Sequence, residues 1–373
     1  MRVKLEDVCE RGSSNIKQSD IIKMRGNYPI YGASGLVGKV NFYHQEQPYV
    51  AVVKDGAGIG RTTLNPAKSS VIGTMQYLIP KKNVLPEYLF YVVSYMHLEK
   101  YYTGATIPHI YFKDYKNEEF NLDNIEKQLE IIEVLGRCKK VIEARKQELV
   151  KLDRLTKARF VEMFGDPATN PYNWDKVNIS EVVGDKVSNG FFAKRDDYAD
   201  DGNVSVMGVA YIVNRMYSQW QDLPRTNGTD KDIEKFEVKY GDMLFCRSSL
   251  VAEGIGKASI VPEDVPQNTL FECHVIRLPL DLSKCVPEYM QVFSTMEYFR
   301  QQIIAQSKTA TMTTIGQDGI LKADILLPPM SKQREFYAFV HQVNKSKFDT
   351  MTFAPIYAII NLYLHTYFYQ GRR

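Results

Sequence analysis

The strongest constraint on the fold of this chain is an internal duplication with a period of about 200 residues. Three short motifs recur in one order, 196, 201 and 205 positions later: Gly58-Ile59-Gly60-Arg61 as Gly254-Ile255-Gly256-Lys257, Pro86-Glu87-Tyr88 as Pro287-Glu288-Tyr289, and Lys127-Gln128 as Lys332-Gln333. Solenoid repeats are much shorter, at ~20–50 residues. The sequence therefore predicts a two-part unit that occurs twice, and a pseudo-twofold chain suits a target with two half-sites.

Composition sets the outer bounds. The 373 residues allow two to three domains at roughly 150 residues each. Apolar residues at 44% and charged residues at 24% are typical of a soluble globular protein, and a net charge of +3 does not by itself indicate nucleic acid. Five cysteines without a Cys-x-x-Cys spacing predict neither a disulfide framework nor a metal site. The first residues carry no apolar signal segment, so we expect a cytoplasmic protein.

Two mixed domains alternate with two helical segments in the predicted layout. Residues 1–122 and 167–328 contain turn formers, short helices such as 85–101, and strand-like runs at 49–53, 71–79, 243–246 and 274–278. Residues 123–166 form a long helix, and residues 329–373 hold a second, shorter helix and an aromatic tail. We therefore expect an α+β fold in which each of two duplicated α/β domains is followed by a helix.

The first helical segment carries a long apolar seam. From Asn124 to Phe164 there is no proline. Apolar residues recur three and four apart, except where Arg145 fills a seam position, at Ile131, Leu135, Cys138, Ile142, Leu149 and Leu152. About 40 residues at 1.5 Å each make a rod of ~60 Å. Such a seam needs a partner helix, in this chain or another. The second helical pattern runs from Ser331 to about Phe348.

The glycine turns do not resemble a nucleotide-binding loop. Gly56-Ala57-Gly58-Ile59-Gly60-Arg61 lacks the Gly-Lys-Ser/Thr ending, and Thr62 to Asn65 reads as a strand rather than a helix. A tight turn that brings the backbone close to a groove is the better interpretation. Both copies end in a cation, Arg61 or Lys257, and this recurrence favours a phosphate contact.

Two motifs allow an enzymatic interpretation. Asn170-Pro171-Tyr172 lacks the second proline of an amino-methyltransferase element, so we interpret it as a turn. Glu237-Val238-Lys239 has the Glu-x-Lys spacing of a metal-dependent nuclease but has no counterpart in the first half. With six scattered histidines and no paired spacing, we expect no bond chemistry, no metal and no cofactor.

Each unit also has a threonine-rich loop before its last strand. The first runs from Thr103 to Ile110 and includes Thr106 and His109; the second runs from Lys308 to Ile315 and includes Thr309 and Thr311. Hydroxyls, a histidine and adjacent cations are suitable donors to phosphate oxygens and base edges. A polar loop without a function is the alternative interpretation.

This layout resembles the specificity subunit of type I restriction–modification enzymes. Four sequence motifs also resemble motifs of that family: Tyr28-Pro29-Ile30-Tyr31-Gly32-Ala33-Ser34-Gly35, Pro86-Glu87-Tyr88-Leu89, Thr106-Ile107-Pro108 and Arg159-Phe160-Val161-Glu162-Met163-Phe164-Gly165-Asp166-Pro167. The resemblance covers residues 1 to about 350. It implies a non-catalytic DNA-binding protein whose two domains each contact half of a bipartite, asymmetric duplex site. It further implies that the two helices pack as an antiparallel coiled coil that spaces the half-sites, and that methyltransferase subunits and a motor-endonuclease subunit are the partners.

The chain departs from that family after about Phe348. Thr350-Met351-Thr352-Phe353-Ala354-Pro355 interrupts the second helix, and an aromatic run follows to Gly371-Arg372-Arg373. The apolar stretch Phe353–Tyr369 is at the short end of the ~17–25 residues that a bilayer requires. We interpret it as a shortened helix with an atypical tail rather than a membrane span.

These observations give one set of candidate residues and two alternatives. The predicted DNA contacts are the cations, hydroxyls and histidine of the loops and strand ends: Lys39, Lys54, Arg61, Thr106, His109, Lys113, Arg247, Lys257, Lys308, Thr309 and Thr311. The turn cation and threonine loop of each domain are expected on one common face. A stand-alone nuclease centred on Glu237 and Lys239, and a structural coiled-coil adaptor, are the alternative functions.

Overall fold

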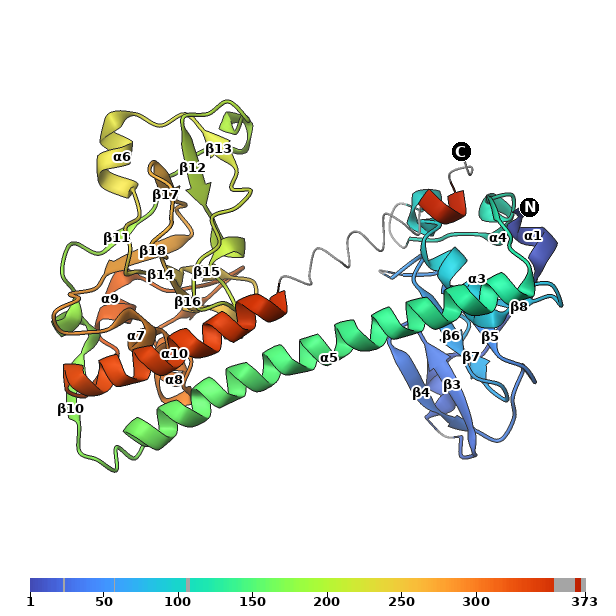
Figure 1. Ribbon diagram of the computed structural model, residues 1–373, viewed down its shortest axis with the longest axis horizontal. Helices are drawn as coiled ribbons and strands as arrows, with labels where there is room; N and C mark the ends of the chain where they lie inside the picture. The colour runs from blue at the N-terminus through green and yellow to red at the C-terminus, as the bar shows by residue number, and fades with distance from the viewer. Residues whose placement is uncertain (23, 57, 105–107, 352–365, 370–373) are drawn as a thin grey trace. The chain divides into compact units, whose positions relative to one another are not determined.

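The computed structural model describes residues 1–22, 24–56, 58–104, 108–351 and 366–369, and its contacts divide the chain into two compact units (Figure 1). Unit 1 comprises Met1–Gln147 together with Met351 and the described residues 366–369. Unit 2 comprises Glu148–Thr350. The helix α5 (Ile125–Phe164) contributes its first part to unit 1 and its last part to unit 2.

Unit 1 is a mixed α/β fold. Its strands are β1 (Arg2–Lys4), β2 (Cys9–Ser13), β3 (Tyr28–Gly32), β4 (Gly35–Val40), β5 (Tyr49–Val53), β6 (Thr62–Asn65), β7 (Ser70–Val71), β8 (Met75–Pro80) and β9 (Glu119–Asn121). Its short helices are α1 (Leu5–Val8), α2 (Gln18–Ile21), α3 (Pro86–Ser94), the 3-10 helix η1 (Leu98–Tyr101) and α4 (Phe112–Tyr115).

Unit 2 repeats this arrangement. Its strands are β10 (Asp175–Asn178), β11 (Ser188–Asn189), β12 (Val204–Met207), β13 (Arg225–Thr226), β14 (Asp242–Cys246), β15 (Ser248–Ser249), β16 (Ala258–Ile260), β17 (Thr269–Phe271), β18 (Val275–Pro279), β19 (Lys308–Thr309), β20 (Thr313–Thr314) and β21 (Asp324–Leu327). Its helices are η2 (Ile179–Val182), η3 (Arg195–Asp197), η4 (Val209–Tyr211), α6 (Asp230–Phe236), η5 (Ala252–Gly254), α7 (Pro287–Ser294), α8 (Glu297–Ala305), α9 (Gln317–Leu321) and α10 (Met330–Met351).

The sheet topology confirms the predicted duplication. The four-stranded sheet β2-β8-β5-β6 of unit 1 matches β11-β18-β14-β16 of unit 2. The three-stranded sheet β4-β3-β7 matches β13-β12-β17, and in each copy the middle strand pairs parallel with the last. Two-stranded antiparallel sheets, β1-β9 and β10-β21, complete the match. Unit 2 also has the three-stranded sheet β15-β20-β19, and the corresponding residues of unit 1 form single antiparallel bridges, Asp55 with His109 and Thr103 with His109.

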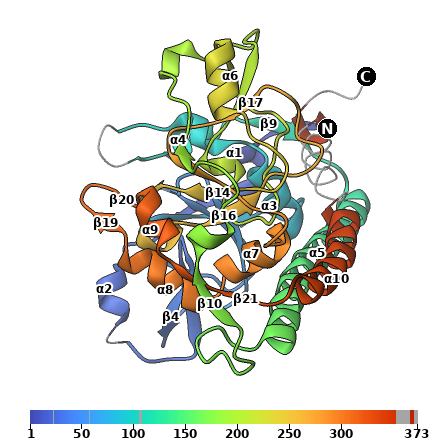
Figure 2. The ribbon, with the colours of Figure 1, turned by 90° about the vertical axis from the view of Figure 1, so that its left-hand side faces the viewer.

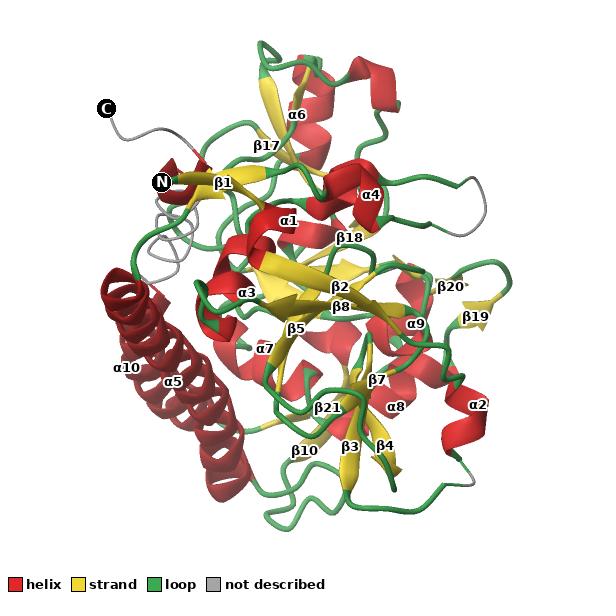
Figure 3. Ribbon diagram, turned by 90° about the vertical axis from the view of Figure 1, so that its right-hand side faces the viewer, coloured by secondary structure: helices red, strands yellow, loops and turns green. Residues whose placement is uncertain are grey.

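The core of each unit lies between the four-stranded sheet and the helix that begins with Pro-Glu-Tyr. Every residue of β5 and of β14 is buried, as expected for the β-branched and apolar central strand of a covered sheet. Helix α3 packs on β5 and β6, and helix α7 packs on β14 and β16 (Figures 2 and 3). Proline at the first position of both helices fits the N-terminal turn, where its missing N–H costs nothing.

Three predicted boundaries are wrong. The run 71–79 is two strands, β7 and β8, because Ile72-Gly73-Thr74 turns between them. The helix expected over 85–101 is α3 and η1, separated where His97 adopts a left-handed φ of 52°. The strand predicted from His274 begins at Val275.

A buried glutamine joins each domain to the helix that follows it. Gln128 is fully buried on α5; its Oε1 accepts from the Leu85 amide at 2.9 Å, and its Nε2 donates to the carbonyls of Asn83 and Asp123. Gln333 on α10 makes the same three bonds, to the Val286 amide and to the carbonyls of Lys284 and Pro328. The Lys-Gln motif is therefore a joint in which one side chain satisfies three backbone groups.

Helices α5 and α10 pack antiparallel within unit 2. Asp153 pairs with Lys347 at 2.5 Å, Arg159 reaches Glu335 at 3.5 Å, and Phe164 contacts Phe336 at a ring separation of 5.5 Å. Phe160 and Phe164 also enter the core of unit 2 against Tyr289. The antiparallel helix pair is confirmed along this stretch.

The predicted seam residues lie in different surroundings. Leu135 is buried and packs with Ile131 against the core of unit 1, while Ile142, Leu149 and Leu152 are half-buried. On α5, contacts with α10 are made instead by Asp153, Arg159, Phe160 and Phe164. The role of the seam in helix pairing stays a prediction.

The last aromatic residues have a place in the fold that the sequence analysis did not foresee. Residues 366–369 are helical and pack on unit 1. Phe368 is fully buried with its ring 5.5 Å from that of Tyr88, and the Tyr367 carbonyl accepts from Asn121 Nδ2 at 3.0 Å. Most of the predicted tail, 352–365, lies outside the described residues, and no helix among those described is long and apolar enough to cross a membrane.

Candidate nucleic-acid interface

The glycine turn of each unit is held by equivalent backbone hydrogen bonds. In unit 1 the Gly60 amide donates to the Val53 carbonyl at 2.9 Å; in unit 2 the Gly256 amide donates to the Cys246 carbonyl at 2.8 Å. Both glycines have left-handed φ, 80° and 61°, which side chains rarely adopt. The residues after β5 and β14, Lys54 and Arg247, are therefore structural counterparts.

The threonine-rich loop attaches at the same place in each unit. The Ile110 amide donates to the Lys54 carbonyl at 2.9 Å, and the Ile315 amide donates to the Arg247 carbonyl at 3.0 Å. Both isoleucines are buried and anchor the loop end. The predicted loops thus lie beside the strand end that carries Lys54 or Arg247, and their role stays a prediction.

In unit 1 this arrangement brings a histidine, a lysine and a carboxylate together. His109 Nδ1 lies 2.7 Å from Asp55 Oδ1, and Lys54 Nζ lies 3.9 Å from the other oxygen of Asp55. These three side chains are 27–37% exposed, so they remain accessible to a ligand. Asp55 gives the cluster an acceptor that the sequence analysis did not include.

The other predicted residues of unit 1 are more scattered. Arg61 is exposed and donates to the Ala33 carbonyl at 3.1 Å; it forms no ion pair among the described residues. Lys39 is exposed on β4, and Lys113 on α4 lies 5.3 Å from the centre of the Tyr111 ring. Thr106 lies outside the described residues.

In unit 2 the threonine-rich loop is a β-hairpin. Strands β19 and β20 pair antiparallel, β20 also pairs with β15, and the Thr309 and Thr313 hydroxyl oxygens are 3.0 Å apart. Lys308, Thr309 and Thr311 are exposed. Arg247 Nη1 donates to the Cys273 carbonyl at 3.3 Å, which holds the guanidinium beside this hairpin's sheet. The arrangement presents cations and hydroxyls to solvent, as a phosphate or base contact requires.

Lys257 lies in a different environment from the hairpin. Its Nζ donates to Asn214 Oδ1 at 2.7 Å, and it lines a cavity with residues of α5, α7, α8 and α10. Lys308, Thr309 and Thr311 do not line that cavity. The grouping of Lys257 with the threonine loop on one face therefore stays a prediction.

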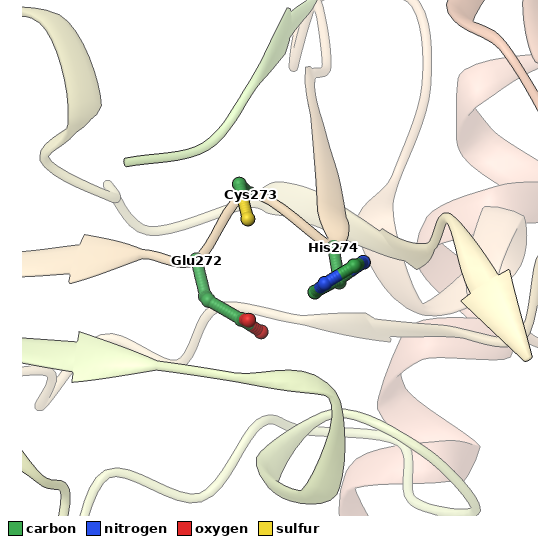
Figure 4. Close-up of side chains that lie close together, drawn as sticks. All are labelled: Glu272, Cys273 and His274. Atoms are coloured by element: carbon green, nitrogen blue, oxygen red, sulfur yellow. The ribbon is translucent and has the colours of Figure 1, made fainter. Parts of the chain in front are cut away.

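One group of side chains in unit 2 can offer ligands to a metal ion. Glu272, Cys273 and His274, in the turn between β17 and β18, have ligand atoms within 4.8 Å of one another (Figure 4). Burial, reinforced by the Glu272 carboxylate, raises the pKa of the Cys273 thiol. His274 Nδ1 is already 3.1 Å from Ser248 Oγ. Unit 1 has Ile72-Gly73-Thr74 at this turn, so the cluster is particular to unit 2.

The geometry does not favour the nuclease interpretation. Glu237 Oε1 accepts a hydrogen bond from the Asn268 amide at 2.7 Å. Asp232 Oδ2 accepts hydrogen bonds from the amide and the hydroxyl of Thr229, the N-cap residue of α6. These carboxylates therefore complete local backbone structure. The Lys239 amide likewise donates to Asp242, whose carboxylate pairs with Arg277 at 2.7 Å in the interior.

Sequence reasoning missed Asp55, Ser248 and His274. A signal was present for the last two, because they align with strand ends and turns of the first copy once the duplication is followed residue by residue. Asp55 follows a predicted buried strand and precedes the glycine turn, where a polar side chain marks the strand end.

The fold defines a class of protein with two copies of a mixed α/β unit, each followed by a helix, and loops of equivalent placement on both copies. Residues 1–154 match the type I restriction modification DNA specificity domain. The chain is therefore similar to type I restriction–modification specificity subunits, and the family model matches its first 154 residues.

Three similar proteins carry related names. The specificity subunit of the type I restriction enzyme MjaIX from Methanocaldococcus jannaschii is 20% identical over 292 residues, which cover 70% of this chain and 63% of that protein. The S subunit of a type I system from M. genitalium has the same fold, with a TM-score of 0.58, 11% identity and coverage of 100% of this chain and 96% of that one. A chain from a structure of complex assembly in a type I system has a TM-score of 0.49 and 14% identity, over 98% and 97% of the two chains.

Proposed function

We propose that this chain is the sequence-specific DNA-binding subunit of a type I restriction–modification complex. It reads a bipartite, asymmetric duplex site, one half-site with each unit, and recruits methyltransferase subunits and a motor-endonuclease subunit in the cytoplasm. It performs no bond chemistry itself. The relative from M. jannaschii is longer, and this chain spans 63% of it, so the assignment rests on the site as well as on the family.

One observation carries the proposal: the two units hold their loops with the same backbone bonds but fill them with different side chains. Unit 1 presents Lys54, Asp55 and His109, whereas unit 2 presents Arg247, Ser248 and a threonine hairpin. Equivalent scaffolds with unlike donors and acceptors are what a protein needs to read two different half-sites. The cations at both loops supply phosphate contacts.

Selection of duplexes from a random library by the full chain tests this function. We expect two short recognised segments separated by a fixed unrecognised gap, with an affinity that falls as salt rises. Replacing Thr311 with Ala should change the preferred bases in one segment, and His109→Asn should change them in the other. Arg61→Gln should weaken binding to all sequences and lower the salt slope by about one.

The alternatives give different results. A coiled-coil adaptor would show no salt-dependent DNA affinity, and a nuclease would cut DNA without partners and lose that activity in Glu237→Ala. As a control, Lys82→Gln removes an exposed lysine that belongs to neither loop. Selection of a single continuous site would contradict the proposal.

A further inference from the structure

A cavity of about 440 Å³ in unit 2 has strongly cationic walls. Its charged lining residues come from three helices and two loops: Lys157 on α5, Arg215 after η4, Lys257 before β16, Arg300 on α8, Lys347 on α10, and one carboxylate, Asp153 on α5. Five cations against one carboxylate leave a formal excess of four positive charges. The labelled elements can be followed in Figures 1 and 2.

Most of these cations are not neutralised by the protein. Asp153 pairs with Lys347. In the described part of the chain, no carboxylate lies within 4.0 Å of the charged groups of Lys157, Arg215, Lys257 or Arg300. Like charges gathered in a cavity repel each other, so the arrangement is best completed by an anion.

Arg300 has a buried hydrogen-bond donor that lacks an acceptor among the residues that the structure describes. Its Nη2 donates to the carbonyls of Ile255 and Glu253, at 2.6 and 3.2 Å, while its Nη1 is buried without a partner among the described residues. A buried donor without an acceptor costs roughly 1–3 kcal/mol. Ser294 and Thr295 cannot serve as donors, because their hydroxyls donate to carbonyls of α7. The cations are therefore the groups left for a ligand.

We propose that this cavity holds a backbone phosphate of the bound duplex, in contact with Lys157, Lys257 and Arg300. The inference rests on the proposed function and adds a contact away from the threonine hairpin. Guanidinium and ammonium groups are the usual protein ligands of phosphate oxygens. The described lining has no aromatic side chain on which a base could stack, which favours a phosphate of DNA over a free nucleotide.

The contact is confined to unit 2. A Cβ on Gly256 would lie 3.6 Å from Arg300 Nη1, whereas a Cβ on the equivalent Gly60 would lie 3.3 Å from Glu99 Oε2. The position that carries a cation in unit 2 thus carries a carboxylate in unit 1. We therefore expect Arg300 to add a contact in unit 2 that has no counterpart at the glycine turn of unit 1.

Salt-dependent binding of the full chain to its selected duplex tests the inference. Lys157→Gln, Lys257→Gln and the double variant should each weaken binding to all sequences alike, and the double variant should lower the salt slope by about one, because the two lysines share one phosphate. Asp153→Asn should strengthen binding, because Asp153 is the one carboxylate among the described residues that line the cavity. Lys151→Gln is the matched control, an exposed lysine of α5 outside the cavity.

The outcomes separate this inference from the function on which it rests. If the wild-type chain binds no DNA, both fail. If it binds and neither lysine variant changes the slope, only the cavity contact is overturned. Thermal unfolding with inorganic phosphate or ATP, in the absence of DNA, tests for a small-anion site. If phosphate or ATP stabilises the wild-type chain but not the double variant, and the salt dependence of DNA binding is the same in both, the cavity is a small-anion site and the duplex contact is refuted.

Discussion

Units 1 and 2 agree where side chains bond to the backbone and differ where side chains face solvent. Gln128 and Gln333 make the same three bonds, and Tyr88 and Tyr289 each donate to a backbone carbonyl, of Asn121 and Leu326. The loops around Lys54 and Arg247 share their backbone bonds but few side chains. The comparison teaches that the duplicated unit is preserved by a small set of buried polar contacts, which leave the surface free to diverge.

The substitutions with the largest expected effect test whether the core of each unit is completed by an aromatic side chain from the end of a helical segment. Phe160 is buried in unit 2 and Phe368 in unit 1, each against the tyrosine of Pro-Glu-Tyr. Phe160→Ala and Phe368→Ala should each lower the free energy of unfolding by about 3–5 kcal/mol. Calorimetry of the full chain measures this loss.

Val161→Ala is the control for that pair, because Val161 is 40% exposed beside Phe160 on α5. It should change stability by less than about 0.5 kcal/mol. A Phe368→Ala chain as stable as this control would show that the C-terminal aromatic residues do not close unit 1, and the likeness of the two units would end there.

A second comparison concerns the glutamine joint. Gln128→Ala and Gln333→Ala each leave three backbone groups without their side-chain partner, so each should cost about 2–3 kcal/mol. Chemical denaturation of both variants, with the exposed Gln147→Ala as control, measures the loss. Unequal losses in the free energy of unfolding would mean that the glutamine joint stabilises one unit more than the other.

The smallest expected effect is a difference between the units in how their stability depends on pH. Glu288 is 1% exposed, and its equivalent Glu87 is half-buried. Burial raises the pKa of Glu288, so folded unit 2 binds more protons than the unfolded chain just above the ordinary glutamate pKa. Its stability should therefore fall as pH rises through that window, and Glu288→Gln should remove this slope.

Unfolding measured at several pH values, with Glu87→Gln as the matched variant, checks this expectation. The Glu87 variant should keep the wild-type slope. An unchanged slope in Glu288→Gln would mean that Glu288 does not produce the pH dependence of unit 2.

Periodicity and the repeated motifs were sufficient to predict the architecture. The helix from Asn124 to Phe164 is α5 within one residue, because an uninterrupted apolar stripe without proline leaves few alternatives. Pro-Glu-Tyr correctly marked α3 and α7. Strand pairing could not be predicted, since a run such as 71–79 does not show that a tight turn at Gly73 divides it.

The candidate site was less predictable for a physical reason. The loops could be located because they recur, but side-chain neighbours depend on contacts between distant segments. Asp55 meets His109 across 54 positions, and Arg300 approaches Glu253 across 47. Nothing local in the sequence marks Arg300 as partly unpaired or Gln128 as buried.

The glutamine joint has a consequence for how such a chain can change over generations. Gln128 and Gln333 bond only to main-chain atoms, and the residues that supply those atoms differ between the copies: Asn83, Leu85 and Asp123 in one, Lys284, Val286 and Pro328 in the other. A reading domain therefore needs a main-chain path, not a set of matching side chains, to seat on its helix. If the proposed function holds, exchange of a whole domain at this joint would change the DNA target and leave the helix as it is.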